Sequence, residues 1–258
     1  MKTSSGDGTT IGYDLLGSGR PVVIVGGALQ GRASYRPLAE VLAARFTVFN
    51  YDRRGRGDSG DTAPYSVERE VEDLAAVIAA AGGFASVYGH SSGAGLVLHA
   101  AERGLPIDKI VLHELPFDPD EDDRATREEA EKYRLLLDEG RRGDAVELFL
   151  ASAGMPPEIV AHVRNDPAMV ANAPTLLYDP FEVMSTESRG CRTPVEQADA
   201  VTNPALVLAG TESPPWMVNT ARELANALTQ GKLHVMEGQG HVVPPELLSP
   251  VLTEFLAT

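Results

Sequence analysis

The most constraining feature of the sequence is the pentapeptide Gly-His-Ser-Ser-Gly at residues 89–93. It lies between an apolar run at residues 85–88, typical of a short buried strand, and a run of small residues up to Glu102 that favours a helix. A strand that turns directly into a helix strains the residue at the turn, and flanking glycines avoid Cβ clashes across the bend. The pattern predicts an exposed, nucleophilic Ser91 hydroxyl, although the same pentapeptide also occurs in ordinary glycine-rich turns.

Composition narrows the classes of partner. The chain has 258 residues, enough for one large α/β domain, and its net charge of −15 argues against nucleic acid and anionic membrane surfaces as partners. Cys191 is the only cysteine, so no intrachain disulfide or cysteine-based metal cluster can form. No apolar run reaches the ~20 residues of a membrane span, and the start lacks a signal-peptide pattern. We expect a soluble, cytoplasmic protein that acts on a small molecule; its oligomeric state stays open.

Short apolar runs alternate with helical patterns along most of the chain. The runs that read as strands are at residues 10–13, 22–25, 46–49, 85–88, 110–113, 205–208 and 233–235. Between two of them, Ser66 is suited to cap a helix with an apolar stripe at Val67, Val71, Leu74 and Ile78. Strands and helices in such alternation predict an α/β fold with a mostly parallel sheet and helices on both faces.

The alternation stops between residues 118 and 196. Helical patterns there are separated by prolines, and the segment connects two strands whose carboxyl ends face the functional edge of the sheet. We interpret residues 118–196 as a helical lid, and residues 1–117 and 197–258 as the core, because loops at this edge form the ligand crevice of open α/β sheets. A helical excursion without a role in binding fits the same pattern.

A serine nucleophile needs a base and a third group that holds the base. His241 follows the last apparent strand in Gly-Gln-Gly-His, a loop that can bring the imidazole to the sheet edge. Two carboxylates compete for the third role: Glu114 ends the strand at residues 110–113, and Glu212 follows the strand at residues 205–208. Both follow the carboxyl end of a strand, so the position of the strands alone leaves the choice open.

A developing oxyanion needs backbone N–H groups aimed at it. Ser92, the residue after the nucleophile, supplies one of these groups. The loop after residues 22–25 is expected to supply the other, and we assign it to Ala28 in the run Gly-Gly-Ala.

Together these residues resemble the α/β-hydrolase superfamily, with the nucleophile, acid and histidine in that chain order. The run Tyr-Asp-Arg-Arg-Gly-Arg-Gly-Asp-Ser at residues 51–59 resembles the family's turn after its fourth strand. The resemblance covers nearly the whole chain, with the lid least well matched. It implies an α/β-hydrolase fold: a mostly parallel sheet of about eight strands with a helical lid.

The chain departs from the family pattern at two places. Most members carry His-Gly in the oxyanion loop, where this chain has Gly26-Gly27, and most carry aspartate at the position of Ser213. The missing aspartate shifts the assignment of the acid to Glu114, since a subset of the superfamily places its acid after the sixth strand. Among that subset, the fungal zearalenone lactonases resemble this sequence at residues 91–94 and 113–116.

The resemblance implies a serine hydrolase that cleaves a carboxylic ester or lactone of a small, fairly apolar molecule. Ser91 would attack the carbonyl, His241 would act as base and then acid, and Glu114 would orient His241. The N–H groups of Ala28 and Ser92 would bind the oxyanion, and no metal or organic cofactor is needed.

Other functions of the same fold stay open. Cofactor-free perhydrolases (haloperoxidases) and carbon–carbon bond hydrolases share the serine triad, and some receptors use the fold without catalysis. The turn at residues 89–93 is called the elbow below. A serine at this turn disfavours dehalogenases and epoxide hydrolases, which carry aspartate there. Apolar residues Met155, Phe181, Met184 and Trp216 are suited either to line a substrate pocket or to form the interior of the lid.

Overall fold

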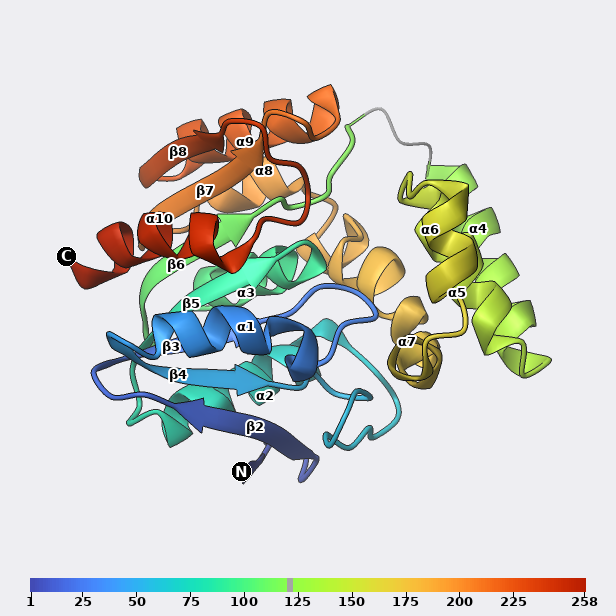
Figure 1. Cartoon of the computed structure of the whole chain (residues 1–258), viewed down its shortest axis with the longest axis horizontal. Helices are drawn as coiled ribbons and strands as arrows, with labels where there is room; N and C mark the ends of the chain where they lie inside the picture. Colours follow the sequence, from blue (N-terminus) through green and yellow to red (C-terminus); the bar gives the residue numbers. More distant parts are fainter. Residues whose placement is uncertain (120–122) are drawn as a thin grey trace.

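The centre of the molecule is an eight-stranded sheet in the order β1-β2-β4-β3-β5-β6-β7-β8 (Figure 1). The computed structural model describes residues 1–119 and 123–258, so residues 120–122 of the predicted lid lie outside the described residues. The strands are β1 (Lys2–Ser4), β2 (Thr10–Leu16), β3 (Arg20–Val25), β4 (Phe46–Tyr51), β5 (Ala85–His90), β6 (Ile107–His113), β7 (Pro204–Gly210) and β8 (Gln230–Met236). Only the pairings of β1 with β2 and of β2 with β4 are antiparallel, which confirms the predicted mostly parallel sheet.

Helices cover both faces of the sheet. One face carries α2 (Val67–Ala80), α3 (Ser92–Glu102), α8 (Pro194–Ala198) and α9 (Pro215–Ala227); the other carries α1 (Arg32–Leu42) and α10 (Pro245–Ala257). Along β3, Val23 and Val25 belong to the first core cluster and Val22 and Ile24 to the second. Successive side chains of a strand point to opposite faces, so a strand covered on both sides needs a continuous apolar run.

Local signals place several element ends. The Ser66 hydroxyl accepts a hydrogen bond from Arg69 N, which confirms the predicted N-cap of α2, and the stripe that follows it is buried. The edge strand β1 is absent from the sequence-based prediction because its three residues carry no apolar pattern. No helix of residues 1–119 and 123–258 combines the length and apolar character needed to cross a membrane.

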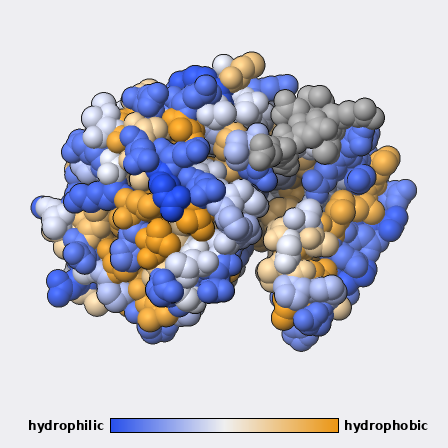
Figure 2. All heavy atoms as spheres, turned by 90° about the horizontal axis from the view of Figure 1, so that it is seen from above, coloured by the Kyte–Doolittle hydropathy of each residue, from blue (hydrophilic) through white to orange (hydrophobic). Residues whose placement is uncertain are grey.

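Between β6 and β7 the chain forms a run of helices. They are α4 (Asp123–Asp138), α5 (Arg142–Ser152), α6 (Pro157–Val163), α7 (Pro167–Asn172), and the short turns η1 (Ala173–Leu177), η2 (Asp179–Val183) and η3 (Glu187–Arg189). The outer helices α4 to α6 stand beside the sheet domain in Figure 1, and Figure 2 shows a notch between them and the rest of the molecule.

The interval predicted as the lid contains two packing environments. Tyr133, Val146 and Leu176 belong to a cluster, here called the lid cluster, that is formed by side chains of this interval together with Leu29 of the loop after β3. Val183 and Ala198 instead belong to the core cluster on the α3 face of the sheet. The outer helices therefore have their own apolar interior, whereas the chain from η2 onward packs on the core.

Three buried histidines are held in the neutral form. Burial lowers the pKa of His90 and of His99 to about 3, and it lowers the pKa of His113 well below its usual value. On α3, His99 Nε2 donates to the carbonyl of Val183 at 3.0 Å, and its Nδ1 accepts from Arg103 at 3.0 Å. A neutral imidazole offers one donor and one acceptor, so both ring nitrogens of His99 are used without a second proton.

We expect the free energy of unfolding to fall as the pH drops below about 6.5, the ordinary pKa of these side chains. Between that pH and about 3 the unfolded chain binds protons that the folded chain excludes, so stability rises with pH by up to ~1.4 kcal/mol per unit for each histidine. Above 6.5 both states are neutral and the effect vanishes. Urea unfolding at pH 7, 6 and 5 measures the slope. His99→Gln, which keeps one donor and one acceptor, should reduce the slope by about one proton; an unchanged slope would contradict the assignment.

Candidate active site

Ser91 occupies a sharp turn between β5 and α3. Its backbone has φ 56° and ψ −128°, which confirms the predicted strain at this position. A Cβ on Gly89 would lie 2.5 Å from the carbonyl oxygen of Gly93, and a Cβ on Gly93 would lie 2.4 Å from that of Val25. Both glycines are therefore required sterically, and the turn brings the start of α3 against the end of β3.

Backbone strain gathers around this turn. Among the described residues, the non-glycine positions with positive φ are Leu29, Ser91, Glu114 and Cys191. Leu29 lies in the loop after β3, and Glu114 directly follows β6, so three of the four lie at the carboxyl edge of the sheet. Strained backbone of this kind costs about 1–3 kcal/mol at each residue and persists where surrounding contacts impose it, often at functional sites.

The Glu114 carboxylate is fully buried and directed at His241. Its Oε2 lies 3.2 Å from His241 Nδ1, and its Oε1 accepts from Gly210 N at 2.7 Å. The Ser213 hydroxyl lies 2.9 Å from each carboxylate oxygen. Burial opposes ionisation, but the hydrogen bonds from His241, Gly210 and Ser213 outweigh it and lower the pKa of Glu114. The group is a carboxylate that accepts a hydrogen bond from the histidine.

Glu212, the competing acid, is not brought to His241. Its side chain is exposed and makes no hydrogen bond within residues 1–119 and 123–258, while its backbone N–H donates to Gln239 O at 2.8 Å. Ser213 occupies the position where the superfamily usually has aspartate. Its hydroxyl donates a hydrogen bond to the Glu114 carboxylate. Of the two candidates, the geometry pairs Glu114 with His241.

The loop of His241 is also held through its backbone. His90 Nε2 lies 2.8 Å from the carbonyl oxygen of His241, and His90 Nδ1 lies 2.9 Å from Tyr35 Oη, which accepts from Gly27 N at 2.9 Å. A carbonyl can only accept, so Nε2 of His90 carries the proton and Nδ1 accepts from the Tyr35 hydroxyl. The pKa of about 3 for His90, lowered by burial, agrees with this neutral form. Sequence reasoning missed this contact.

Ser91 and the loop after β3 are close neighbours. A Cβ on Gly27 would lie 2.9 Å from Ser91 Cβ and 3.5 Å from Ser91 Oγ. The backbone N–H groups of Ala28 and Ser92 make no hydrogen bond within the described ranges. Ser91 Oγ likewise has no hydrogen-bond partner among the described residues, His241 included. Hydrogen bonds between a nucleophile and its base often form only when substrate is bound.

The apolar residues suggested for a pocket have different surroundings. The Phe181 ring packs 5.6 Å from the Tyr133 ring inside the lid cluster, and Met184 packs against the sheet core. Met155 is exposed, and Trp216 at the start of α9 is half-buried. Phe181 therefore contributes to the interior of the lid, the second of the two roles suggested by the sequence.

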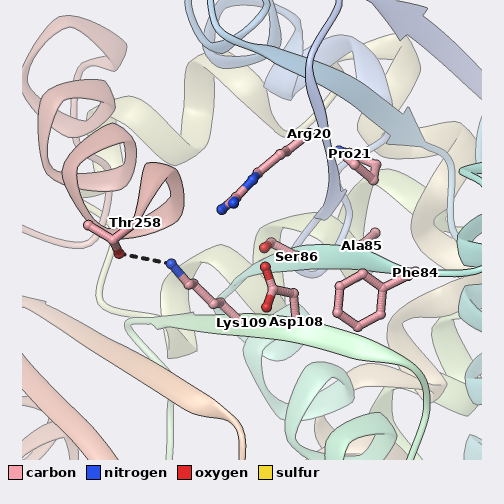
Figure 3. Close-up of a pocket in the computed structure, with 8 residues that line it drawn as sticks. All are labelled: Arg20, Pro21, Phe84, Ala85, Ser86, Asp108, Lys109 and Thr258. Carbon is pink, nitrogen blue, oxygen red and sulfur yellow. Dashed lines mark hydrogen bonds between the residues drawn. The ribbon is translucent and has the colours of Figure 1, made fainter.

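A surface hollow of about 350 Å³ lies at the opposite edge of the sheet, at the starts of β3 and β5 (Figure 3). Its Lys109 ammonium makes structural contacts: it donates to Phe255 O and to Thr258 Oγ1, each at 2.9 Å. These bonds tie β6 to the end of α10. The hollow lies where β3, β5 and β6 meet the end of α10, and it is separate from the residues around Ser91.

Comparison with known proteins agrees with the fold of the chain. A solved alpha/beta hydrolase from Sphaerobacter thermophilus DSM 20745 is 48% identical, with a TM-score of 0.88 and coverage of 99% of both chains. The enol-lactonase from Burkholderia xenovorans LB400 has the same fold, with 19% identity, a TM-score of 0.72 and coverage of 100% of both chains.

A curated protein from Azorhizobium caulinodans, provisionally named a carbamate hydrolase, is 38% identical over 109 residues. These residues are 40% of this chain and 41% of that protein, so the match spans about two fifths of the curated relative. The model of the Alpha/beta hydrolase family matches residues 22–250. Since the match covers most of the sequence, and the sheet and elbow have the expected form, this chain belongs to the alpha/beta hydrolase family.

Proposed function

We propose that this hydrolase cleaves a carboxylic ester or lactone of a small, fairly apolar molecule through an acyl-enzyme formed on Ser91. The observation that carries the proposal is the pairing of a buried carboxylate, Glu114, with His241 at the sheet edge that also presents the strained Ser91. A strained serine, a histidine and an ionised acid form the arrangement that activates a hydroxyl for acyl transfer.

The first half-reaction follows from the hydrogen bonds of His241. Because Glu114 accepts from Nδ1, the proton of the neutral imidazole lies on Nδ1 and Nε2 has a free lone pair. Nε2 takes the proton of Ser91 Oγ as this oxygen bonds to the carbonyl carbon of the substrate. The carbonyl electron pair moves onto oxygen, and the N–H groups of Ala28 and Ser92 stabilise this oxyanion.

Collapse of the tetrahedral intermediate breaks the bond to the alcohol oxygen, which receives the proton from His241 Nε2. The acyl group then remains on Ser91. A water molecule attacks the acyl carbon with His241 again acting as base, and the second collapse releases the carboxylic acid and restores the Ser91 hydroxyl. A lactone gives the same sequence, with the alcohol still attached to the acyl chain.

The charges near Ser91 support a substrate whose reacting part is uncharged. Arg53, Arg56, Glu70 and Asp179 are each 1% exposed and are paired with one another. With these charges balanced, none of these four residues offers a free ionic partner to a substrate. The fold likeness to an enol-lactonase supports the ester or lactone class.

A fluorophosphonate probe tests the proposal on the intact protein. Of the two adjacent serines, Ser91 is the one available to react with the phosphorus centre, because Ser92 Oγ is buried and donates to Asp179 at 2.6 Å. Mass spectrometry of the fragmented peptide should place the adduct on Ser91, with none on Ser92. Modification of another residue in folded protein, with Ser91 unmodified, would overturn the assignment.

A further inference from the structure

The loop after β3 is held by two buried arginines from the turn after β4. Arg53 Nη1 donates to Gly26 O at 3.2 Å, and Arg56 Nη1 donates to Gly27 O at 2.7 Å and to Gln30 O at 3.4 Å. Both guanidinium groups are 1% exposed. Charge-assisted hydrogen bonds in a buried site are stronger than neutral ones, so they fix the orientation of these peptide groups.

Holding Gly27 O also orients the proposed oxyanion donor. The carbonyl of Gly27 and the N–H of Ala28 belong to one planar trans peptide, in which the two groups point in opposite directions. With Arg56 fixing the oxygen on one side, the Ala28 N–H must point to the other. The neighbouring peptide is fixed as well, because Gly27 N donates to Tyr35 Oη at 2.9 Å.

Both arginines donate hydrogen bonds to the carboxylate of Asp179. Asp179 Oδ1 accepts from Arg53 Nη1 at 2.6 Å, and Asp179 Oδ2 accepts from Arg56 Nη2. The same Oδ1 accepts from the hydroxyl of Ser92 at 2.6 Å. Asp179 therefore contacts the residue that carries one oxyanion donor and, through Arg56, the peptide that carries the other.

Asp179 comes from η2, within the interval predicted as the lid. A second lid residue, Asn172 of α7, donates through Nδ2 to Leu29 O at 2.9 Å, and the Leu29 side chain packs in the lid cluster. Arg53 and Asp179 are 126 positions apart in the sequence. The loop after β3 thus takes its shape from the lid as well as from the sheet.

We propose that Asp179 is a positioning residue that fixes both N–H donors of the oxyanion hole, so that the lid takes part in stabilising the transition state. This inference rests on the proposed function of Ser91. It predicts that disturbing Asp179 weakens binding of a tetrahedral oxyanion much more than binding of a planar carbonyl compound.

The first test is Asp179→Asn, which keeps the size of the side chain and removes its charge. The kcat/KM for a p-nitrophenyl ester should fall by about 10²–10³-fold, mainly in kcat, because preorganised donors act on the transition state. The affinity for an aryl trifluoromethyl ketone, which forms a tetrahedral adduct on Ser91, should fall in parallel. The affinity for the matching methyl ketone should stay within threefold, and the pH profile of kcat/KM should not shift.

Asp73→Asn is the matched control. Asp73 is also 1% exposed, and it accepts from Arg54 Nε at 2.7 Å and Nη2 at 2.8 Å. Within the described ranges, this pair makes no hydrogen bond to the loop after β3. The control should lose stability while keeping kcat/KM and the trifluoromethyl ketone affinity within threefold of the wild type. Equal losses in both variants would show that the effect is general destabilisation, and this would overturn the proposal.

If Asp179→Asn does not fold, Arg56→Lys tests the positioning role of Asp179. Lysine keeps the positive charge beside Asp179 but lacks the planar fork that reaches both Asp179 and Gly27 O. Its trifluoromethyl ketone affinity should fall at least tenfold; an unchanged affinity in a folded variant would overturn the inference. Wild-type protein that reacts with neither fluorophosphonate nor trifluoromethyl ketone would instead show that the proposed function has failed.

Discussion

Ser91→Ala should lower kcat/KM for ester hydrolysis by at least about 10⁴-fold while leaving the protein folded. The substitution removes the attacking oxygen, and water is then the only nucleophile at the carbonyl. Ser91 Oγ makes no hydrogen bond among the described residues, and alanine retains the Cβ that already tolerates φ 56° at the turn. The free energy of unfolding should therefore change by less than about 0.5 kcal/mol.

The measurement is steady-state hydrolysis of a p-nitrophenyl ester, combined with urea unfolding of each variant. Ser249→Ala, at a buried serine on α10, is the matched control and should keep full activity. The fluorophosphonate adduct should disappear in Ser91→Ala and persist in Ser249→Ala. A Ser91→Ala protein that retains a tenth of the wild-type rate would contradict a nucleophilic role for Ser91.

The parts of the site that sequence reasoning found are those specified by local pattern. The glycines of the elbow are needed at fixed spacing around Ser91, because each approaches a backbone oxygen too closely for a Cβ. The parallel sheet follows from continuous apolar runs such as β3, whose residues alternate between two core clusters. The position of Glu114 directly after β6 followed from the end of such a run.

The parts that were missed depend on contacts between distant segments. Arg53 and Arg56 lie in a run that resembles the family turn, and the sequence does not show which carboxylate neutralises them. Their partner Asp179 lies in the least family-like interval, 126 positions from Arg53. The sequence signal that was available is the concentration of arginine in residues 53–56 of an acidic chain, since buried cations need buried anions.

The same contacts change the interpretation of the lid. Sequence reasoning interpreted residues 118–196 as a helical lid at the ligand crevice, separate from the core. Val183 packs in the sheet core, and Asp179 pairs with both Arg53 and Arg56. Among the described residues, removal of η2 would leave buried Arg56 without a carboxylate partner and Arg53 with Glu70 alone. Substitutions confined to α4, α5 and α6 are therefore better suited to test substrate selection than deletion of the whole interval.

Glu114→Gln should lower kcat by about 10³–10⁴-fold, because an amide cannot stabilise the imidazolium that forms on His241. The amide can still accept from Gly210 N through its oxygen. Its NH₂ group cannot accept from His241 Nδ1, and this favours the tautomer with the proton on Nε2, where the base is needed. Glu212→Gln should cost less than about tenfold, since the Glu212 side chain is exposed.

The two variants are compared at equal folded fraction, verified by urea unfolding, with one ester substrate across pH 5 to 9. Glu212→Gln is the matched control because it makes the same chemical change on the neighbouring strand end. If Glu212→Gln is the more damaging of the two, the acid is Glu212 and the pairing of Glu114 with His241 is not the one used in catalysis.

A second substitution separates the charge of Glu114 from its packing. Ser213 Oγ lies 2.9 Å from both Glu114 oxygens, so a carboxylate placed at this position can reach the same histidine loop. Ser213→Asp in the Glu114→Gln background should recover kcat by at least about tenfold, because it restores one buried negative charge beside the imidazolium. Ser213→Asp alone places two carboxylates side by side, and their repulsion should lower stability. Full loss in the double variant, with the fold intact, would show that the site requires the carboxylate on the strained backbone of Glu114 itself.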